Sequence, residues 1–223
     1  IRFLLLTGVS KFSKAGVFSN LNHLIDITLD DAYSSLVGIT EEELKKEFST
    51  YISDLAIKEN KTEEETLNTI RAWYNGYRFS PEGISVYNPF STLNFMDEKE
   101  AQSYWYSTGT PSFLIDEIKK HPQSVIPLSG TSALKSALSD ISKVDNIKLS
   151  ALMFQTGYLT IRGYNAEENS YQLDFPNREV KEAFFNSLIQ EFTEVDPLEV
   201  SRAAKEVKND LDNLELDPFI SKM

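Results

Sequence analysis

The chain opens on an almost unbroken apolar run. Ile1 and residues 3–6 are hydrophobic, and Thr7-Gly8 ends the run. Continuous runs of this kind are typical of strands covered on both faces, as in parallel α/β sheets. Nothing later in the chain predicts the rest of a parallel sheet. The pattern therefore predicts that the chain is the C-terminal portion of a larger protein.

In residues 30–120 the apolar residues recur with the spacing of several amphipathic helices. Thr40 and Thr62 are each followed by three glutamates, so each predicts a capping box in which the Thr hydroxyl and the third Glu bond reciprocally. Apolar residues with helical spacing follow each start: Leu44, Phe48, Tyr51, Ile52 and Leu55, and then Leu67, Ile70, Trp73 and Tyr74. Asn75-Gly76 ends the second helix, and Asn88-Pro89 and Thr110-Pro111 open two more, over residues 90–96 and 112–120.

The pattern changes after residue 120. Residues 131–141 and 149–156 are predicted as helices, and residues 158–162 and 171–175 alternate like two strands of a hairpin. Asn177 then caps an amphipathic helix, and Asp196 caps the last one. Helix, helix and hairpin is the order of a winged helix-turn-helix.

These patterns predict a mostly helical protein with a small β component. We expect residues 1–29 to form the end of an α/β core. A helical segment over residues 30–120 and a winged-helix-like domain over residues 121–195 follow. Residues 196–223 are predicted as a linker helix.

Composition narrows the functional classes. Hydrophobic residues make up 41% of the chain, which is enough for real cores. The chain has no Cys and only His23 and His121, which excludes thiolate zinc sites and argues against a His-based one. We see no signal peptide and no transmembrane run, so we expect a cytoplasmic protein without membrane contact. A net charge of −12 argues against binding nucleic acid through a broad basic face.

The segment 8–15, GVSKFSKA, has only a superficial likeness to a phosphate-binding loop. Ser13 stands where the second Gly is needed, and Ala15 stands where a hydroxyl residue would hold Mg²⁺. No dinucleotide, metalloprotease or nucleophile-elbow motif occurs either. We therefore expect no catalytic residue in this chain and no enzyme activity from it alone.

Two segments could still contact a ligand. Thr7, Ser10 and Lys11 follow the first strand, and ligands bind at the carboxyl ends of strands in α/β sheets. An ordinary strand-to-loop exit is the alternative. The segment 73–79, WYNGYRF, places Arg78 among four aromatics, which suits a reader of phosphate or carboxylate groups. Core packing is the alternative there.

The candidate recognition helix covers residues 148–156. Lys148 is its only cation, and Met153, Phe154 and Gln155 are its other candidate contact residues. A helix that reads DNA needs Arg, Lys, Asn or Gln toward the bases, and the predicted wing carries two glutamates. The helix therefore favours contact with a protein or another domain over DNA.

Several stretches together resemble the bacterial AAA-ATPase-like family, which is often fused to a C-terminal PD-(D/E)XK nuclease-like domain. They are LTGVSKFSK (6–14), WYNGYRF (73–79), VYNPF (86–90), YWYSTGTPSF (104–113), FQTGYLT (154–160) and FPN (175–177). The resemblance implies that the chain is the terminal strand of a P-loop core, followed by a helical lid and a winged-helix domain. Thr7, Ser10 and Lys11 then fall in the sensor-1 segment, and Arg78 or Arg71 is the candidate lid residue that faces the phosphates.

The same resemblance implies ATP and Mg²⁺ for the parent protein, with neither expected on this chain. Its implied partners are a missing N-terminal ATPase core and a C-terminal nuclease-like domain. The first functional hypothesis is a nucleotide-sensing lid and winged-helix module that couples ATP binding to a partner or to the nuclease-like domain. A non-catalytic protein-interaction module is the alternative, and a DNA-binding winged helix is a third.

Overall fold

The computed structural model describes residues 25–107, 112–120, 130–139 and 149–192, together with residues 5, 7, 8, 196, 198–200, 202, 203 and 205. Contacts divide the chain into two compact units, residues 1–181 and 182–223. The first unit contains almost all of the described elements and all of the candidate site. Most of the strand predicted at the start of the chain lies outside the described residues.

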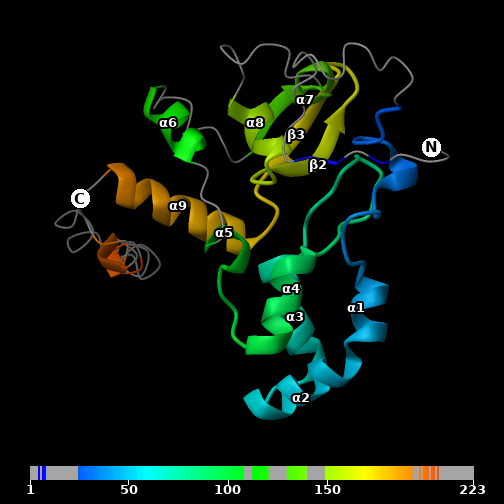
Figure 1. Cartoon of the computed structure of the whole chain (residues 1–223), viewed down its shortest axis with the longest axis vertical. Coiled ribbons are helices and arrows are strands. Elements are labelled where there is room, and N and C mark those ends of the chain that lie inside the picture. Colours follow the sequence, from blue (N-terminus) through cyan, green and yellow to red (C-terminus); the bar gives the residue numbers. More distant parts are fainter. Residues whose placement is uncertain are drawn as a thin grey trace, which may run out of the picture. The chain divides into compact units, whose positions relative to one another are not determined.

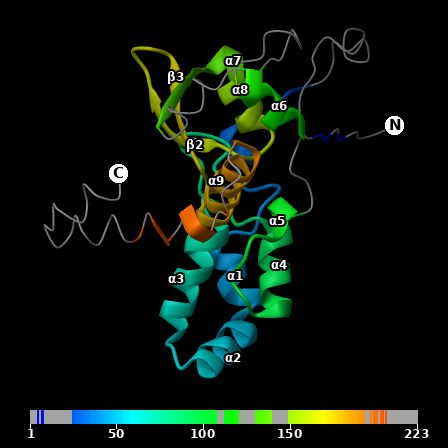
Figure 2. The same cartoon turned by 90° about the vertical axis from the view of Figure 1, so that its left-hand side faces the viewer.

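The part of the first unit up to residue 107 is helical (Figure 1). Its elements are η1 (Asp31–Tyr33), α1 (Glu41–Glu47), α2 (Ser49–Glu59), α3 (Glu63–Tyr74), α4 (Pro89–Glu98) and α5 (Tyr104–Ser107). Their apolar faces share one buried cluster: Leu44, Ile52, Leu55, Leu67, Ile70, Tyr74, Tyr87, Phe95, Met96 and Tyr104. Figure 2 shows α1, α3 and α4 close together, with α2 across their ends.

Both predicted capping boxes are present. The Thr40 hydroxyl accepts from the Glu43 amide at 3.2 Å, and the Glu43 carboxylate accepts from the Thr40 amide at 2.8 Å. Thr62 and Glu65 repeat the arrangement at the same two distances. The apolar residues between Leu44 and Leu55, which the sequence predicted on one helix, belong to two helices instead. Phe48 has φ −113° and ψ 15° and separates α1 from α2. Tyr51, which the helical spacing grouped with the buried Ile52 and Leu55, is exposed.

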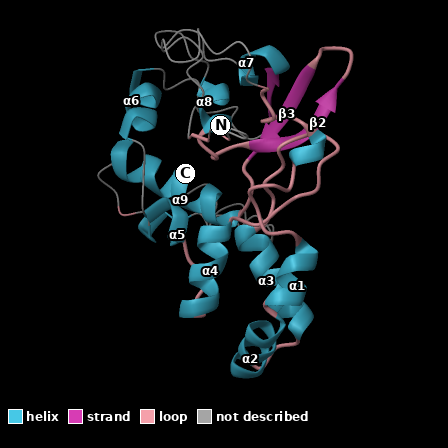
Figure 3. Ribbon diagram, turned by 45° about the vertical axis from the view of Figure 1, so that its right-hand side comes forward, coloured by secondary structure: helices cyan, strands magenta, loops and turns pink. Residues whose placement is uncertain are grey.

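The remainder of the first unit contains a three-stranded antiparallel sheet (Figure 3). Its elements are α6 (Ser112–Lys120), β1 (Thr131–Leu134), α7 (Lys135–Ser139), α8 (Leu149–Gln155), β2 (Thr160–Asn165) and β3 (Ser170–Asp174). The strand order is β1-β3-β2, with Leu173 opposite both Thr131 and Ile161. The predicted hairpin is therefore confirmed, and the chain is mostly helical with a small sheet.

The single helix predicted over residues 131–141 is wrong in its first half. Thr131–Leu134 is β1, which pairs with β3, and only Lys135–Ser139 is helical. Within β1 only Ala133 is buried, so the local pattern carries little strand signal. Pairing with β3 decides the conformation, because sheet preference depends on the neighbouring strand more than on the segment itself. Helix α9 (Arg178–Phe192) begins directly after Asn177, as predicted, and the Asn177 side chain accepts from the Val180 amide at 3.1 Å.

Candidate functional site

The segment 73–79 ends α3 and then turns sharply. Asn75 is the C-cap of α3, and Gly76 follows with φ +111°. Tyr77 then exchanges two backbone hydrogen bonds with Val86, at 3.2 and 2.9 Å. The residues after the helix are therefore held in an extended conformation rather than in a loose loop.

Gly76 lies directly against the corner between β3 and α9. A Cβ built on Gly76 would lie 1.9 Å from the carbonyl oxygen of Pro176. No side chain fits at that distance, and the positive φ independently favours glycine. The WYNGYRF and FPN stretches, about a hundred residues apart, thus meet at van der Waals contact through this residue.

Arg78 joins the same segment to β2 through its backbone. Its amide donates to the Thr160 hydroxyl at 2.7 Å, and that hydroxyl donates to the Arg78 carbonyl at 3.1 Å. Thr160 is only 2% exposed, so these bonds are shielded from water. One buried threonine therefore satisfies both backbone groups of Arg78.

The guanidinium groups of Arg78 and Arg162 are held by backbone carbonyls. Arg78 donates from Nε to Gly83 at 2.9 Å and from Nη2 to Pro81 at 3.0 Å. Arg162 donates from Nη2 to both Phe175 and Pro176, at 2.7 and 2.9 Å. Each planar fork is consequently fixed in place by two acceptors.

Glu179 is a fully buried carboxyl group in the first turn of α9. It accepts from the Ser91 hydroxyl of α4 at 2.9 Å and from the Trp105 amide of α5 at 2.8 Å. Burial raises its pKa, and the hydrogen bonds from Trp105 and Ser91 oppose that shift only in part. Its second oxygen, Oε2, has no hydrogen-bond partner among the described residues. The Glu179 side chain thus links α9 to α4 and α5, although burial of its carboxylate carries a desolvation penalty.

Aromatic contacts complete the arrangement. The rings of Trp105 and Tyr158 lie 5.2 Å apart, and Arg178 lies 4.8 Å above the Trp73 ring. We call the meeting point of these segments the motif joint, and we define it by Gly76, Arg78, Trp105, Tyr158, Thr160, Arg162, Pro176 and Glu179. Most of the stretches that carry the family resemblance converge there.

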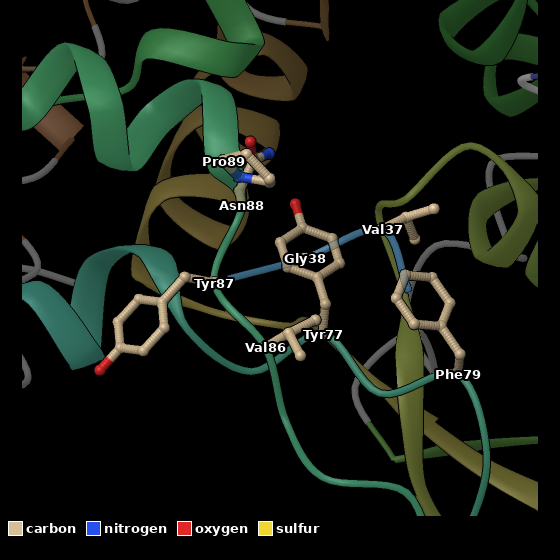
Figure 4. Close-up of a pocket in the computed structure, with 8 residues that line it drawn as sticks. All are labelled: Val37, Gly38, Tyr77, Phe79, Val86, Tyr87, Asn88 and Pro89. Atoms are coloured by element: carbon tan, nitrogen blue, oxygen red, sulfur yellow. The ribbon is translucent and has the colours of Figure 1, made fainter. Parts of the chain in front are cut away.

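A small cavity of about 150 Å³ lies beside the joint (Figure 4). Its lining is mostly apolar: Val37, Gly38, Tyr77, Phe79, Val86, Tyr87, Asn88 and Pro89. Figure 4 shows the Tyr77 ring extending toward Asn88 and Pro89, and burial raises the pKa of its hydroxyl. The cavity is smaller than the roughly 300–1,000 Å³ of typical small-molecule sites. It is therefore too small for a nucleotide.

The residues predicted to face phosphate are only partly brought together. Arg78 belongs to the motif joint, whereas Arg71 pairs with Glu41 at 2.7 Å on the helical part. Partial burial would raise the pKa of Glu41, but hydrogen bonds from Arg71, Tyr87 and Lys45 outweigh it and lower the pKa to about 2. Thr7 is exposed, and Ser10 and Lys11 lie outside the described residues.

The residues that the sequence predicted as contacts of a recognition helix, on α8 and beside it, are mostly interior. Met153 is fully buried and Phe154 is 8% exposed, and Gln155 donates to the Leu138 carbonyl at 3.0 Å. These side chains are occupied by packing within the fold and offer little surface to a partner. Lys148 lies outside the described residues.

The described residues do not by themselves fit ATP and Mg²⁺. Arg71 is paired with Glu41, and Arg78 donates from two of its nitrogens to carbonyls. No group of three or more His, Asp or Glu that could hold a metal ion occurs in the described parts of the chain. The ATP implied by the resemblance would therefore need binding groups beyond those that the structure describes.

Sequence reasoning missed Thr160, Arg162 and Glu179. Glu179 resembles an ordinary first-turn acid after the Asn177 cap, and such residues are usually exposed. Thr160 and Arg162 were recognised only as strand positions. The sequence feature that could have identified these three residues is their position within or beside the FQTGYLT and FPN stretches.

Comparison with known proteins gives one informative match. An uncharacterised protein encoded in the vnfD 5′ region of Azotobacter chroococcum mcd 1 is 40% identical over 194 residues. The match covers 85% of this chain but 34% of that protein, so the chain spans about a third of the relative's length. No family profile and no solved structure matches the chain. Across the described helices, none is both long enough and apolar enough to cross a bilayer.

Proposed function

We propose that this chain is the lid and winged-helix segment of a longer AAA-ATPase-like protein. In that protein it acts as a non-catalytic module that couples the nucleotide-binding core to a partner or to a nuclease-like domain. ATP and Mg²⁺ are bound by other parts of the longer protein in this proposal. The chain itself supplies the mechanical connection.

The order of elements supports the winged-helix part of the proposal. Helix α6, strand β1, helices α7 and α8, and the β2–β3 hairpin follow one another, and β1 completes the sheet beside β3. A helix pair followed by a hairpin is the winged helix-turn-helix arrangement. The length of the Azotobacter relative supports a longer parent.

The motif joint is the observation that carries the coupling role. Buried bonds from Arg78 to Thr160 and from Glu179 to Ser91 and Trp105 tie the lid helices to the sheet and to α9. Buried hydrogen bonds of this kind favour one relative orientation of the elements they join. A displacement of the lid helices is therefore transmitted to the sheet rather than absorbed at a loop.

Hydrogen exchange on the full-length parent protein tests this function. We expect MgATP to change the exchange rates of the Arg78 amide, which lies in the joint, and of the Ile161 amide, which donates to the Arg78 carbonyl at 3.5 Å. The Thr160→Val variant keeps the side-chain shape but loses both hydroxyl bonds, so we expect it to weaken the response at the joint. Thr69→Val is the matched control, because the half-buried Thr69 hydroxyl donates only to the Glu65 carbonyl within α3.

Two results would contradict the proposal. A parent protein without any nucleotide-dependent stabilisation would remove the ATPase part. A parent protein that binds MgATP without any change at the joint would remove the coupling, and would favour the alternative of a free-standing interaction module.

A further inference from the structure

Exposed apolar side chains lie on the three segments that form or adjoin the small cavity beside the motif joint. Each is between 46% and 58% exposed: Tyr33, Leu36 and Val37 before α1, Ile84 in the turn after Arg78, and Phe90 and Leu93 on α4. We call this set the cavity face. Single exposed hydrophobic residues are ordinary, whereas apolar residues gathered at a cavity are typical of an interaction site.

Close backbone contacts hold two of these segments side by side. A Cβ built on Gly83 would lie 2.7 Å from the Cβ of Ser34, and a Cβ built on Gly38 would lie 2.2 Å from a methyl group of Val86. The stretch before α1 therefore lies against the 83–86 segment at two points, and the exposed residues of both stretches belong to one surface.

Helix α4 continues the cavity face. Its first residue, Pro89, lines the cavity, and Leu93 follows four residues later on the same side of the helix, with Phe90 one turn before Leu93. The opposite side of α4 supplies its buried residues: Ser91, Thr92, Phe95 and Met96. Phe90 and Leu93 are thus directed to solvent beside the cavity rather than to the core.

The cavity within this face has the size of one side chain. Its volume of about 150 Å³ is that of an apolar cavity which holds a single benzene ring. Figure 4 shows Val37, Tyr77 and Phe79 together on one side of the 86–88 backbone. A leucine or phenylalanine side chain from another molecule therefore fits the cavity in size and in polarity.

The charges that accompany the cavity face are acidic. Residues 25–39 and 79–98 contain no Lys, Arg or His, and they contain six acids: Asp26, Asp30, Asp31, Glu82, Asp97 and Glu98. Asp30, Asp31 and Glu82 are exposed, and none of them takes part in an ion pair among the described residues. Arg78 precedes the second stretch and offsets one of these charges at most.

We propose that the cavity face docks a basic segment of another protein. The segment inserts one leucine or phenylalanine side chain into the cavity and places Lys or Arg residues near the surrounding carboxylates. An apolar centre with a charged rim is the ordinary arrangement of a protein interface. Charge complementarity selects this occupant, because a second copy of a chain of net charge −12 would be repelled. The proposal does not depend on the ATPase assignment.

Binding of a model peptide to this 223-residue chain tests the docking site. The probe is a fluorescently labelled lysine-rich peptide with one central leucine, and its control peptide has alanine in place of the leucine. We expect the leucine peptide to bind about ten-fold more tightly, because burial of a leucine side chain is worth about that factor. Equal affinities, or no binding of the leucine peptide at low salt, would overturn the proposal.

Charge variants separate the docking site from general attraction to an acidic protein. Glu82→Gln combined with Asp97→Asn should weaken binding of the leucine peptide about three-fold. Glu42→Gln combined with Asp54→Asn is the matched control, because it removes the same net charge from exposed positions on α1 and α2. Equal weakening by the two double variants would show that only net charge matters, and the site would be rejected.

Amide NMR of the unchanged chain locates the peptide without any substitution. The leucine peptide must shift the amides of Gly38 and Val86, and shifts confined to other residues would overturn the site. Sedimentation of the chain alone tests the other occupant. A dimer whose formation shifts these same two amides would assign the cavity face to a second copy and would replace the proposal.

Discussion

At the scale of single residues, environment determines what a side chain can do. Glu179 follows an N-cap, where an exposed acid would simply favour the helix dipole. In the structure it is fully buried and accepts from Ser91 and Trp105. Its ionised form therefore pays a desolvation cost that an exposed first-turn acid avoids.

The raised pKa of Glu179 predicts a defined pH dependence of stability. The folded state holds the proton more tightly than the unfolded state, whose pKa is near 4.5. Tighter proton binding at Glu179 therefore stabilises the folded state. This stabilisation is complete below the unfolded-state pKa, and it is lost as the pH rises through the folded-state pKa. Glu179→Gln removes this titration, so its free energy of unfolding relative to the unchanged chain should increase between pH 5 and pH 7.5.

Urea unfolding at both pH values measures this difference. Glu42→Gln, on the exposed first turn of α1, is the control and should show no comparable change between the two pH values. The same Glu179→Gln difference at both pH values would contradict a raised pKa. Glu179→Ala should destabilise by about 1–3 kcal/mol, because it leaves Ser91 and the Trp105 amide unpaired.

At the scale of elements, the contacts between distant segments are made at the ends of the helices. The end of α3 is where the chain reverses and meets the β3–α9 corner, and Gly76 makes that approach possible. The start of α9 is the other side of the same contact. Neither element could be displaced without breaking the joint.

Replacement of Gly76 tests this contact. Gly76→Ala combines a positive φ with a clash against the Pro176 carbonyl, so we expect a loss of at least about 3 kcal/mol. Gly130→Ala is the matched control, because Gly130 also has a positive φ of 71° but no atom lies within 4 Å of the position that a Cβ would take there. It should lose only about 1–2 kcal/mol. Equal losses in urea unfolding would show that the Pro176 contact contributes nothing.

At the scale of the whole molecule, charge separates the functional hypotheses. The net charge of −12 repels a phosphate backbone, and helix α8 is largely buried rather than presented to a groove. The exposed loop between β2 and β3 carries Glu167 and Glu168. A DNA-binding role for residues 121–195 therefore has no surface support among the described residues.

We accordingly expect no retardation of duplex DNA by this chain in a gel-shift measurement at about 0.15 M salt, where the Debye length is about 8 Å. Retardation that weakens steeply with added salt would contradict this expectation, because that dependence is the signature of phosphate contacts.

The sequence determined the features that depend on near neighbours. Capping boxes at Thr40 and Thr62, the end of α3 at Asn75, the start of α4 after Asn88 and the β2–β3 hairpin all follow from local chemistry. Each needs only hydrogen bonds or turns within a few residues. These elements were therefore correctly predicted.

Only the tertiary structure decided which distant residues meet. The strand at Thr131–Leu134, the burial of Glu179, the Thr160 contact with Arg78 and the bond from Arg78 to the Arg162 carbonyl join segments 36 to 88 residues apart. Local propensity carries no information on such contacts, because packing and desolvation act on neighbours in space rather than in sequence. The motifs could be recognised along the chain, but their convergence on one joint required the fold.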